Sequence, residues 1–148
     1  PKPGSPRIRI GDRPDEVIET LGGRKSGICW DTGHYILSVE RLGVAPDPAP
    51  AFVRGVTHMH IHDVVDSVDH RPLTPVSARV ARYVHQAVST GGVKSITLEY
   101  DYRLDDAAPG ETECDRVFAH LENAVELVRS WSAGLISRET SHAAASLS

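Results

Sequence analysis

Short apolar segments alternate with amphipathic segments along most of the chain, and this pattern predicts strands separated by helices. Three apolar segments are too short for helices and are predicted to be strands: residues 26–31 (SGICWD), 56–63 (VTHMHIHD) and 95–100 (SITLEY). Apolar residues recur at helical spacing over three other segments: residues 14–21, 75–88 and 115–131. Residues 35–55 have a proline-rich middle, which allows at most two short helices.

Turn and capping residues set the predicted boundaries of these elements. Asp12 is placed to cap the first helix, which begins at Pro14 and ends at Gly22. Pro75 begins a later helix, and Gly91 ends it. Two segments are predicted to lack regular structure: a polar loop at residues 64–74 and a disordered tail of small and polar residues at 132–148.

The predicted order of elements is helix, strand, helical crossover, strand, helix, strand, helix, which favours parallel strands in an α/β fold. Polar residues gather at the carboxyl end of each predicted strand. Asp31 and then His34 follow the first strand, residues 60–63 end the second, and Glu99 is near the end of the third. Functional sites of α/β folds are built at this end of the sheet, so these residues are the candidates for chemistry.

The composition is that of one soluble globular domain or part of a larger one, since 40% of the 148 residues are hydrophobic and 24% are charged. The formal net charge is −4 with no run of Lys or Arg, which favours a small-molecule partner over nucleic acid or an anionic membrane. Cys29 and Cys114 are far apart in the sequence, and no membrane-spanning run or signal peptide is visible. We therefore expect a reduced, cytoplasmic protein.

Three histidines alternate with apolar residues in the segment THMHIHD, residues 57–63. A strand would place His58, His60 and His62 on one face. His58 and His62 would then have Cα atoms about 13 Å apart, too far for both to bind one ion. His60 is therefore the central candidate ligand. His58 is expected one layer below it, and His62 is expected at the mouth, where it contacts substrate or caps the loop.

Asp31, His60 and Glu99 come from the ends of three consecutive strands and form a set of oxygen and nitrogen ligands. Such a set suits a divalent ion of Mn, Mg, Co or Zn. Each residue alone has an ordinary structural explanation. Asp31 could cap a helix, His60 could be a core or surface histidine, and Glu99 could be a salt-bridge partner. Their recurrence at the same end of successive strands is what favours a metal site.

Four motifs together resemble those of the xylose isomerase-like TIM barrels: CWDTGH at 29–34, THMHIHD at 57–63, DHRPL at 69–73 and TLEY at 97–100. This superfamily includes sugar isomerases, ketose 3-epimerases and endonuclease IV. The resemblance covers about residues 12–131. It implies that residues 1–131 form the C-terminal portion of a (β/α)8 TIM barrel, comprising strands six to eight with their helices.

In this family a divalent metal ion is held by Glu, Asp, His and Glu from strands five to eight. The resemblance implies that Asp31, His60 and Glu99 are metal ligands and that His34 and Glu99 are catalytic. His34, His62 and His70 are implied to contact substrate. The implied function is a metal-dependent isomerase or epimerase of sugars or polyols, which transfers a proton through an enediolate.

The strand-five glutamate and strands one to five have no counterpart in this sequence. The opening PKPGSPRIRIGD reads as a loop entered from elsewhere, so we expect the C-terminal part of a longer domain. The isolated chain is then expected to be incomplete as an enzyme. The expected macromolecular partner is a second copy of the chain or a complementing half-barrel.

Two other functions stay open. An endonuclease IV-like zinc nuclease acting on abasic DNA would use D-x-H in the loop after strand seven, where this sequence has Val68, Asp69 and His70. Asp69 or Asp66 with His70 would supply a weaker ligand pair. The other alternative is a truncated remnant or regulatory module without catalytic activity.

Overall fold

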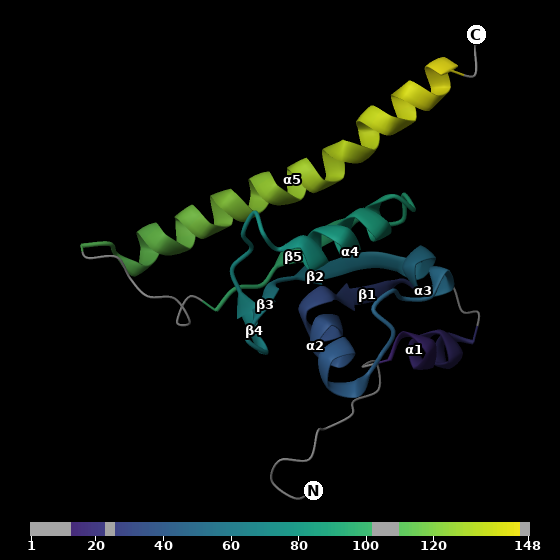
Figure 1. The fold of residues 1–148 in the computed structure, drawn as a ribbon, viewed down its shortest axis with the longest axis horizontal. Coiled ribbons are helices and arrows are strands. Elements are labelled where there is room, and N and C mark those ends of the chain that lie inside the picture. Colours follow the sequence, from purple (N-terminus) through teal and green to yellow (C-terminus); the bar gives the residue numbers. More distant parts are fainter. Residues whose placement is uncertain (1–12, 23–25, 102–109, 146–148) are drawn as a thin grey trace, which may run out of the picture.

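The structure is a computed structural model that describes residues 13–22, 26–101 and 110–145, with side chains described as far as residue 133. Its elements follow one another in the order shown in Figure 1: α1 (Pro14–Leu21), β1 (Ile28–Asp31), α2 (Thr32–Leu42), α3 (Pro50–Gly55), β2 (Val56–Ile61), β3 (Asp63–Val65), β4 (Val68–Arg71), α4 (Ala78–Val88), β5 (Ser95–Leu98) and α5 (Glu113–Ala145).

The central sheet has the strand order β1-β2-β5, and both pairs of neighbours are parallel. Helices α2 and α3 lie between β1 and β2 in the sequence, and α4 lies between β2 and β5. The predicted α/β class with parallel strands is therefore confirmed. The described strands form an open sheet, and the complete (β/α)8 barrel stays a prediction.

One face of this sheet is covered by helices and contains the core. Met59 on the central strand is fully buried on that face. Trp30 packs edge-on against Tyr35 of α2 and Phe52 of α3, with ring centroids 5.5 Å apart in both pairs, and its ring also lies 5.1 Å from that of Tyr83 in α4. The strand residues that alternate with this core, including Cys29 and His58, are directed to the other face.

The segment after β2 is a short antiparallel hairpin of β3 and β4, whereas the sequence predicted a polar loop. Asp66 and Ser67 form its turn with φ angles of 52° and 60°. Positive φ at both central residues is typical of a type I′ turn, for which Asp-Gly is the usual signal and Asp-Ser a weak one. The hairpin extends from the carboxyl end of β2 and so positions Asp69 and His70 beside the candidate site.

Several helix boundaries differ from those predicted. Arg13 occupies the N-cap position of α1, while the predicted cap, Asp12, lies outside the described residues. Helix α4 begins at Ala78 and not at Pro75. Helix α5 continues to Ala145, through most of the segment that was predicted to be a disordered tail. Alanine, arginine and glutamate residues in that segment have high helix propensity, which explains the extension.

Helix α5 contacts α4, and its Ala124 is buried, while Phe118 on the same helix is exposed. Within the described part of the chain, no helix combines the length and the hydropathy needed to span a bilayer.

Candidate metal centre

The candidate residues meet at the carboxyl edge of the parallel sheet. Asp31, the last residue of β1, lies directly opposite His60 of β2 in the strand register. Glu99 follows β5, and its backbone N–H donates to the carbonyl oxygen of Ile61 at 3.0 Å. His60 Nδ1 lies 2.8 Å from Glu99 Oε1. The three residues predicted as metal ligands are therefore neighbours at this edge of the sheet. Among the described residues, however, the histidine whose ligand atom lies within 4.8 Å of those of both Asp31 and Glu99 is His62, whereas His60 groups with Cys29 and His58.

Asp31 also caps helix α2, and both of its oxygens are engaged. Oδ1 accepts a hydrogen bond from the backbone N–H of His34 at 2.9 Å, and Oδ2 lies 2.9 Å from His34 Nδ1. Oδ1 also lies 3.1 Å from His62 Nε2. Burial raises the pKa of Asp31, but the hydrogen bonds from His34 and His62 outweigh it and hold the pKa well below its ordinary value. The carboxylate is thus ionised and fixed in orientation.

His62 is fully buried, just beyond the end of β2, and was predicted to lie at the mouth of the site. Its Nδ1 accepts a hydrogen bond from the backbone N–H of His70 at 2.8 Å, so the proton of the neutral ring is on Nε2 and is directed at Asp31. Ligand atoms of Asp31, His62 and Glu99 lie within 4.8 Å of one another. In this tautomer the Nε2 proton is directed at Asp31, so the His62 ring orients that carboxylate.

Gly33 makes room for the His62 ring at the start of α2. A Cβ atom at position 33 would lie 2.0 Å from His62 Cε1. The ring is held on its other side by His70, which stacks on it at a centroid separation of 4.2 Å and an interplanar angle of 7°. The glycine of the DTGH motif indicates that another group approaches the backbone closely at position 33. The sequence did not show that this group is the His62 ring.

His34 is half exposed and lies between two carboxylates, with Nδ1 near Asp31 and Nε2 3.3 Å from Asp69 Oδ2. The hydrogen bond with Asp31 raises the pKa of His34, burial lowers it, and the charges of Asp31, Asp69 and Glu99 raise it further, with a net increase. A raised pKa suits a residue that donates a proton or hydrogen bond to a substrate oxygen.

His70 and Cys29 complete the surroundings of the centre. His70 Nε2 lies 3.6 Å from Glu99 Oε2, so the hairpin brings this predicted substrate-binding residue to the edge of the site. Cys29 lies on β1 two residues before Asp31, and burial, together with the charges of Asp31 and Glu99, raises the pKa of its thiol. The sequence interpretation gave Cys29 no role.

The raised pKa of His34 gives a testable dependence of stability on pH. A group with a raised pKa in the folded state stabilises that state below its unfolded pKa, about 6.5, and loses this contribution as the pH rises through the folded pKa. We expect His34→Gln to lower the melting temperature by about 1–2 °C at pH 6, because the ring is half exposed and its ion pairs are screened. At about pH 9 the difference should disappear. Thermal unfolding followed by circular dichroism measures both values, and a difference independent of pH would contradict the assignment.

No family model, curated protein or solved structure matches this chain. The resemblance to the xylose isomerase-like barrels therefore stays a prediction that depends on the four sequence motifs alone.

Proposed function

We propose that the protein is a divalent-metal-dependent isomerase or epimerase that transfers a proton next to the carbonyl group of a sugar or polyol. The observation that supports this most is the meeting of Asp31, His60 and Glu99 at the carboxyl edge of a parallel sheet, where Asp31 lies opposite His60 in the strand register and His60 Nδ1 lies 2.8 Å from Glu99 Oε1. These oxygen and nitrogen donors fit Mn²⁺, Mg²⁺, Co²⁺ or Zn²⁺. Each donor is on a strand or directly follows one, so the backbone restricts its position.

The neighbouring residues have distinct proposed roles. A bound divalent ion would polarise the substrate carbonyl and so lower the free energy of the enediolate. Glu99, whose side chain is about one-quarter exposed at 27%, removes and returns the proton. His34, whose pKa Asp31 raises, donates a hydrogen bond to a substrate oxygen. His62 keeps the Asp31 carboxylate in its orientation.

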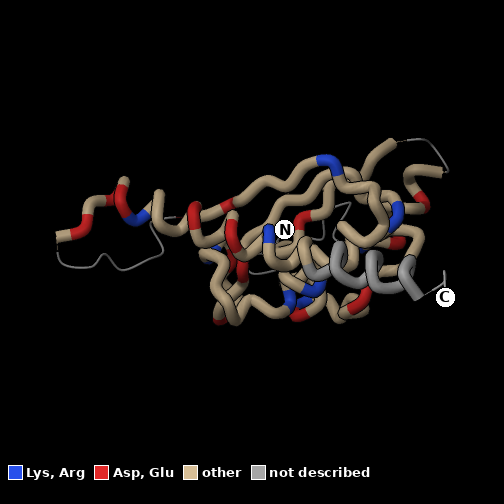
Figure 2. Tube along the Cα trace, turned by 90° about the horizontal axis from the view of Figure 1, so that it is seen from above, with Lys and Arg blue, Asp and Glu red and all other residues tan. Residues whose placement is uncertain are grey.

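The distribution of charge supports a small-molecule substrate over nucleic acid. Figure 2 shows Lys and Arg positions interspersed with Asp and Glu positions in the described part of the chain. A nuclease would need a continuous basic surface to bind the phosphate backbone. The isomerase or epimerase is therefore the better-supported proposal.

The test combines metal binding with proton exchange. Titration with Mn²⁺, followed by electron paramagnetic resonance, should show one bound ion per chain. With Mn²⁺ in D₂O and a panel of ketoses and aldoses, we expect solvent deuterium to enter the carbon next to the carbonyl of at least one sugar, as followed by NMR. Glu99→Gln should lower the rate by about 100-fold or more, because the amide cannot accept the proton.

The exposed Glu126, which pairs with Arg129 on α5, provides the matched control. Glu126→Gln should leave the exchange rate unchanged. Failure to bind Mn²⁺, or exchange that persists unchanged in Glu99→Gln, would rule out the proposed function.

A further inference from the structure

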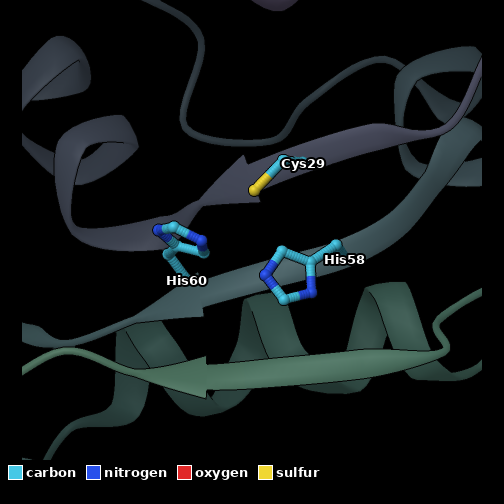
Figure 3. Close-up of side chains that lie close together, drawn as sticks. All are labelled: Cys29, His58 and His60. Carbon is cyan, nitrogen blue, oxygen red and sulfur yellow. The ribbon is translucent and has the colours of Figure 1, made fainter.

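Three side chains with metal-binding atoms lie together on the face of the sheet opposite the core. They lie next to the Asp31 and Glu99 centre, toward the amino ends of the strands. Cys29 of β1 lies opposite His58 of β2 in the strand register, and His60 follows two residues later on the same face. One ligand atom from each of the three lies within 4.8 Å of the others. Figure 3 shows the Cys29 side chain on β1 beside the His58 and His60 rings of β2, with one nitrogen of each ring directed toward the space that the three side chains share.

Hydrogen bonding places a lone pair on Nε2 of each histidine, and in His58 a metal ion would replace the Thr97 hydroxyl that contacts this atom. His60 Nδ1 lies 2.8 Å from Glu99 Oε1, and an ionised carboxylate can only accept, so the proton is on Nδ1 and the lone pair is on Nε2. His58 Nδ1 contacts the Ser95 hydroxyl oxygen at 2.6 Å, and its Nε2 contacts the Thr97 hydroxyl at 3.2 Å. With Nδ1–H donating in the shorter contact, His58 also has its lone pair on Nε2.

The residues that orient the rings come from a single neighbouring strand. Ser95 and Thr97 belong to β5, and Glu99 follows it, at alternate positions that share one face. Metal-binding histidines in proteins usually donate their second ring N–H to a carboxylate or another oxygen acceptor, which fixes the tautomer and the ring orientation. Both imidazoles have such an acceptor here before any metal ion binds. This supporting layer distinguishes the cluster from histidines that are merely adjacent.

We propose that Cys29, His58 and His60 form a second metal site that binds Zn²⁺ through one thiolate and two imidazole Nε2 atoms, with a fourth position open to water or a small ligand. The thiol proton leaves to solvent when the metal–sulfur bond forms. Tetrahedral Zn²⁺ with N and S ligands at 2.0–2.3 Å separates its donors by about 3.3–3.5 Å. The ligand atoms, which lie within 4.8 Å of one another, therefore need to approach by at most about 1.5 Å.

Because it contains a thiolate, this site prefers a different metal ion from the carboxylate centre. Sulfur ligands select Zn²⁺ over Mg²⁺ and Mn²⁺, whereas carboxylates suit the latter two ions. His60 is common to both sites, but a neutral imidazole has a single lone pair and can bind one ion at a time. Zinc in the Cys29 site therefore withdraws His60 from the Asp31–Glu99 centre. The second site thus goes beyond the proposed function, because zinc bound there competes for His60 with the ion of the carboxylate centre.

Cobalt provides the direct test, because Co²⁺ bound to a thiolate has a sulfur-to-metal charge-transfer band in the near ultraviolet. We expect the intact chain to develop this band with one equivalent of Co²⁺ and to lose it when Zn²⁺ is added. Cys29→Ser should abolish the band and weaken Zn²⁺ binding about 100-fold or more. Ser95→Ala, which removes the His58 acceptor, should weaken Zn²⁺ binding about tenfold.

Cys114→Ser is the matched control, because Cys114 is the other free and exposed cysteine and lies on α5. This variant should keep the band. Zn²⁺ should also protect Cys29, but not Cys114, of the unmodified chain from alkylation, a measurement that needs no variant to fold. Absence of the band, its survival in Cys29→Ser, or equal alkylation of both cysteines with zinc present would overturn the second site.

The two proposals fail separately. Cys29→Ser should leave Mn²⁺ binding unchanged, since the carboxylate centre does not include the thiol. If Mn²⁺ does not bind but the cobalt–thiolate band forms, the carboxylate centre is refuted and the zinc site stands. If Mn²⁺ binds and no thiolate band forms, the reverse holds.

Discussion

Replacing Asp31 with asparagine is expected to lower the affinity for Mn²⁺ by more than about 100-fold while leaving the chain folded. The variant loses the negative charge that a hard divalent ion requires. Asparagine is as good an N-cap as aspartate, and its carbonyl oxygen can still accept the backbone N–H of His34, so α2 keeps its start. The affinity is measured by isothermal titration calorimetry, and folding is measured by circular dichroism.

The same substitution should move the pKa of His34 downward, because the hydrogen bond and charge of Asp31 are the main causes of its increase. Histidine ring resonances followed by NMR through a pH titration report this change. Asp47→Asn is the control, since Asp47 is exposed and pairs with Arg82 away from the centre. Equal Mn²⁺ affinity in the two variants would show that the metal ion is not held at Asp31.

The parallel sheet could be predicted from the sequence because its signals are local and consistent. Apolar runs between turn residues marked the strands, and the alternation in THMHIHD placed Met59 in the core and His58 and His60 on the opposite face, as observed. The proximity of Asp31, His60 and Glu99 followed from parallel strands having their carboxyl ends at one edge. No long-range information was needed for this part of the site.

The role of His62 could not be predicted in this way. Strand β2 ends at Ile61, so the His62 side chain no longer follows the alternation of the strand. Its ring lies in the space beside Gly33 instead. Its tautomer is set by the backbone N–H of His70, which a hairpin with a weak turn signal brings into position. Cys29 was missed for a related reason, because the hydroxyl and carboxylate acceptors that prepare its histidine neighbours come from β5, far along the sequence.

Replacing His62 with alanine is expected to lower the free energy of unfolding by about 2–4 kcal/mol, through the cavity that it leaves and the unpaired N–H of His70. It should also weaken Mn²⁺ binding about 10–100-fold, because the Asp31 carboxylate loses the donor that orients it. His62→Gln can place an amide N–H toward Asp31, so we expect it to recover part of the affinity. Urea unfolding and calorimetric titration measure the two quantities on the same preparations.

Met59→Ala distinguishes positioning from general destabilisation. Met59 is as fully buried as His62 but faces the helices, and its truncation should cost about 2–5 kcal/mol of stability. Because Met59 lies on the opposite face of β2 from His58 and His60, the folded fraction of this variant should bind Mn²⁺ as the unmodified chain does. If both alanine variants weaken Mn²⁺ binding equally, the loss reflects instability alone, and His62 has no orienting role.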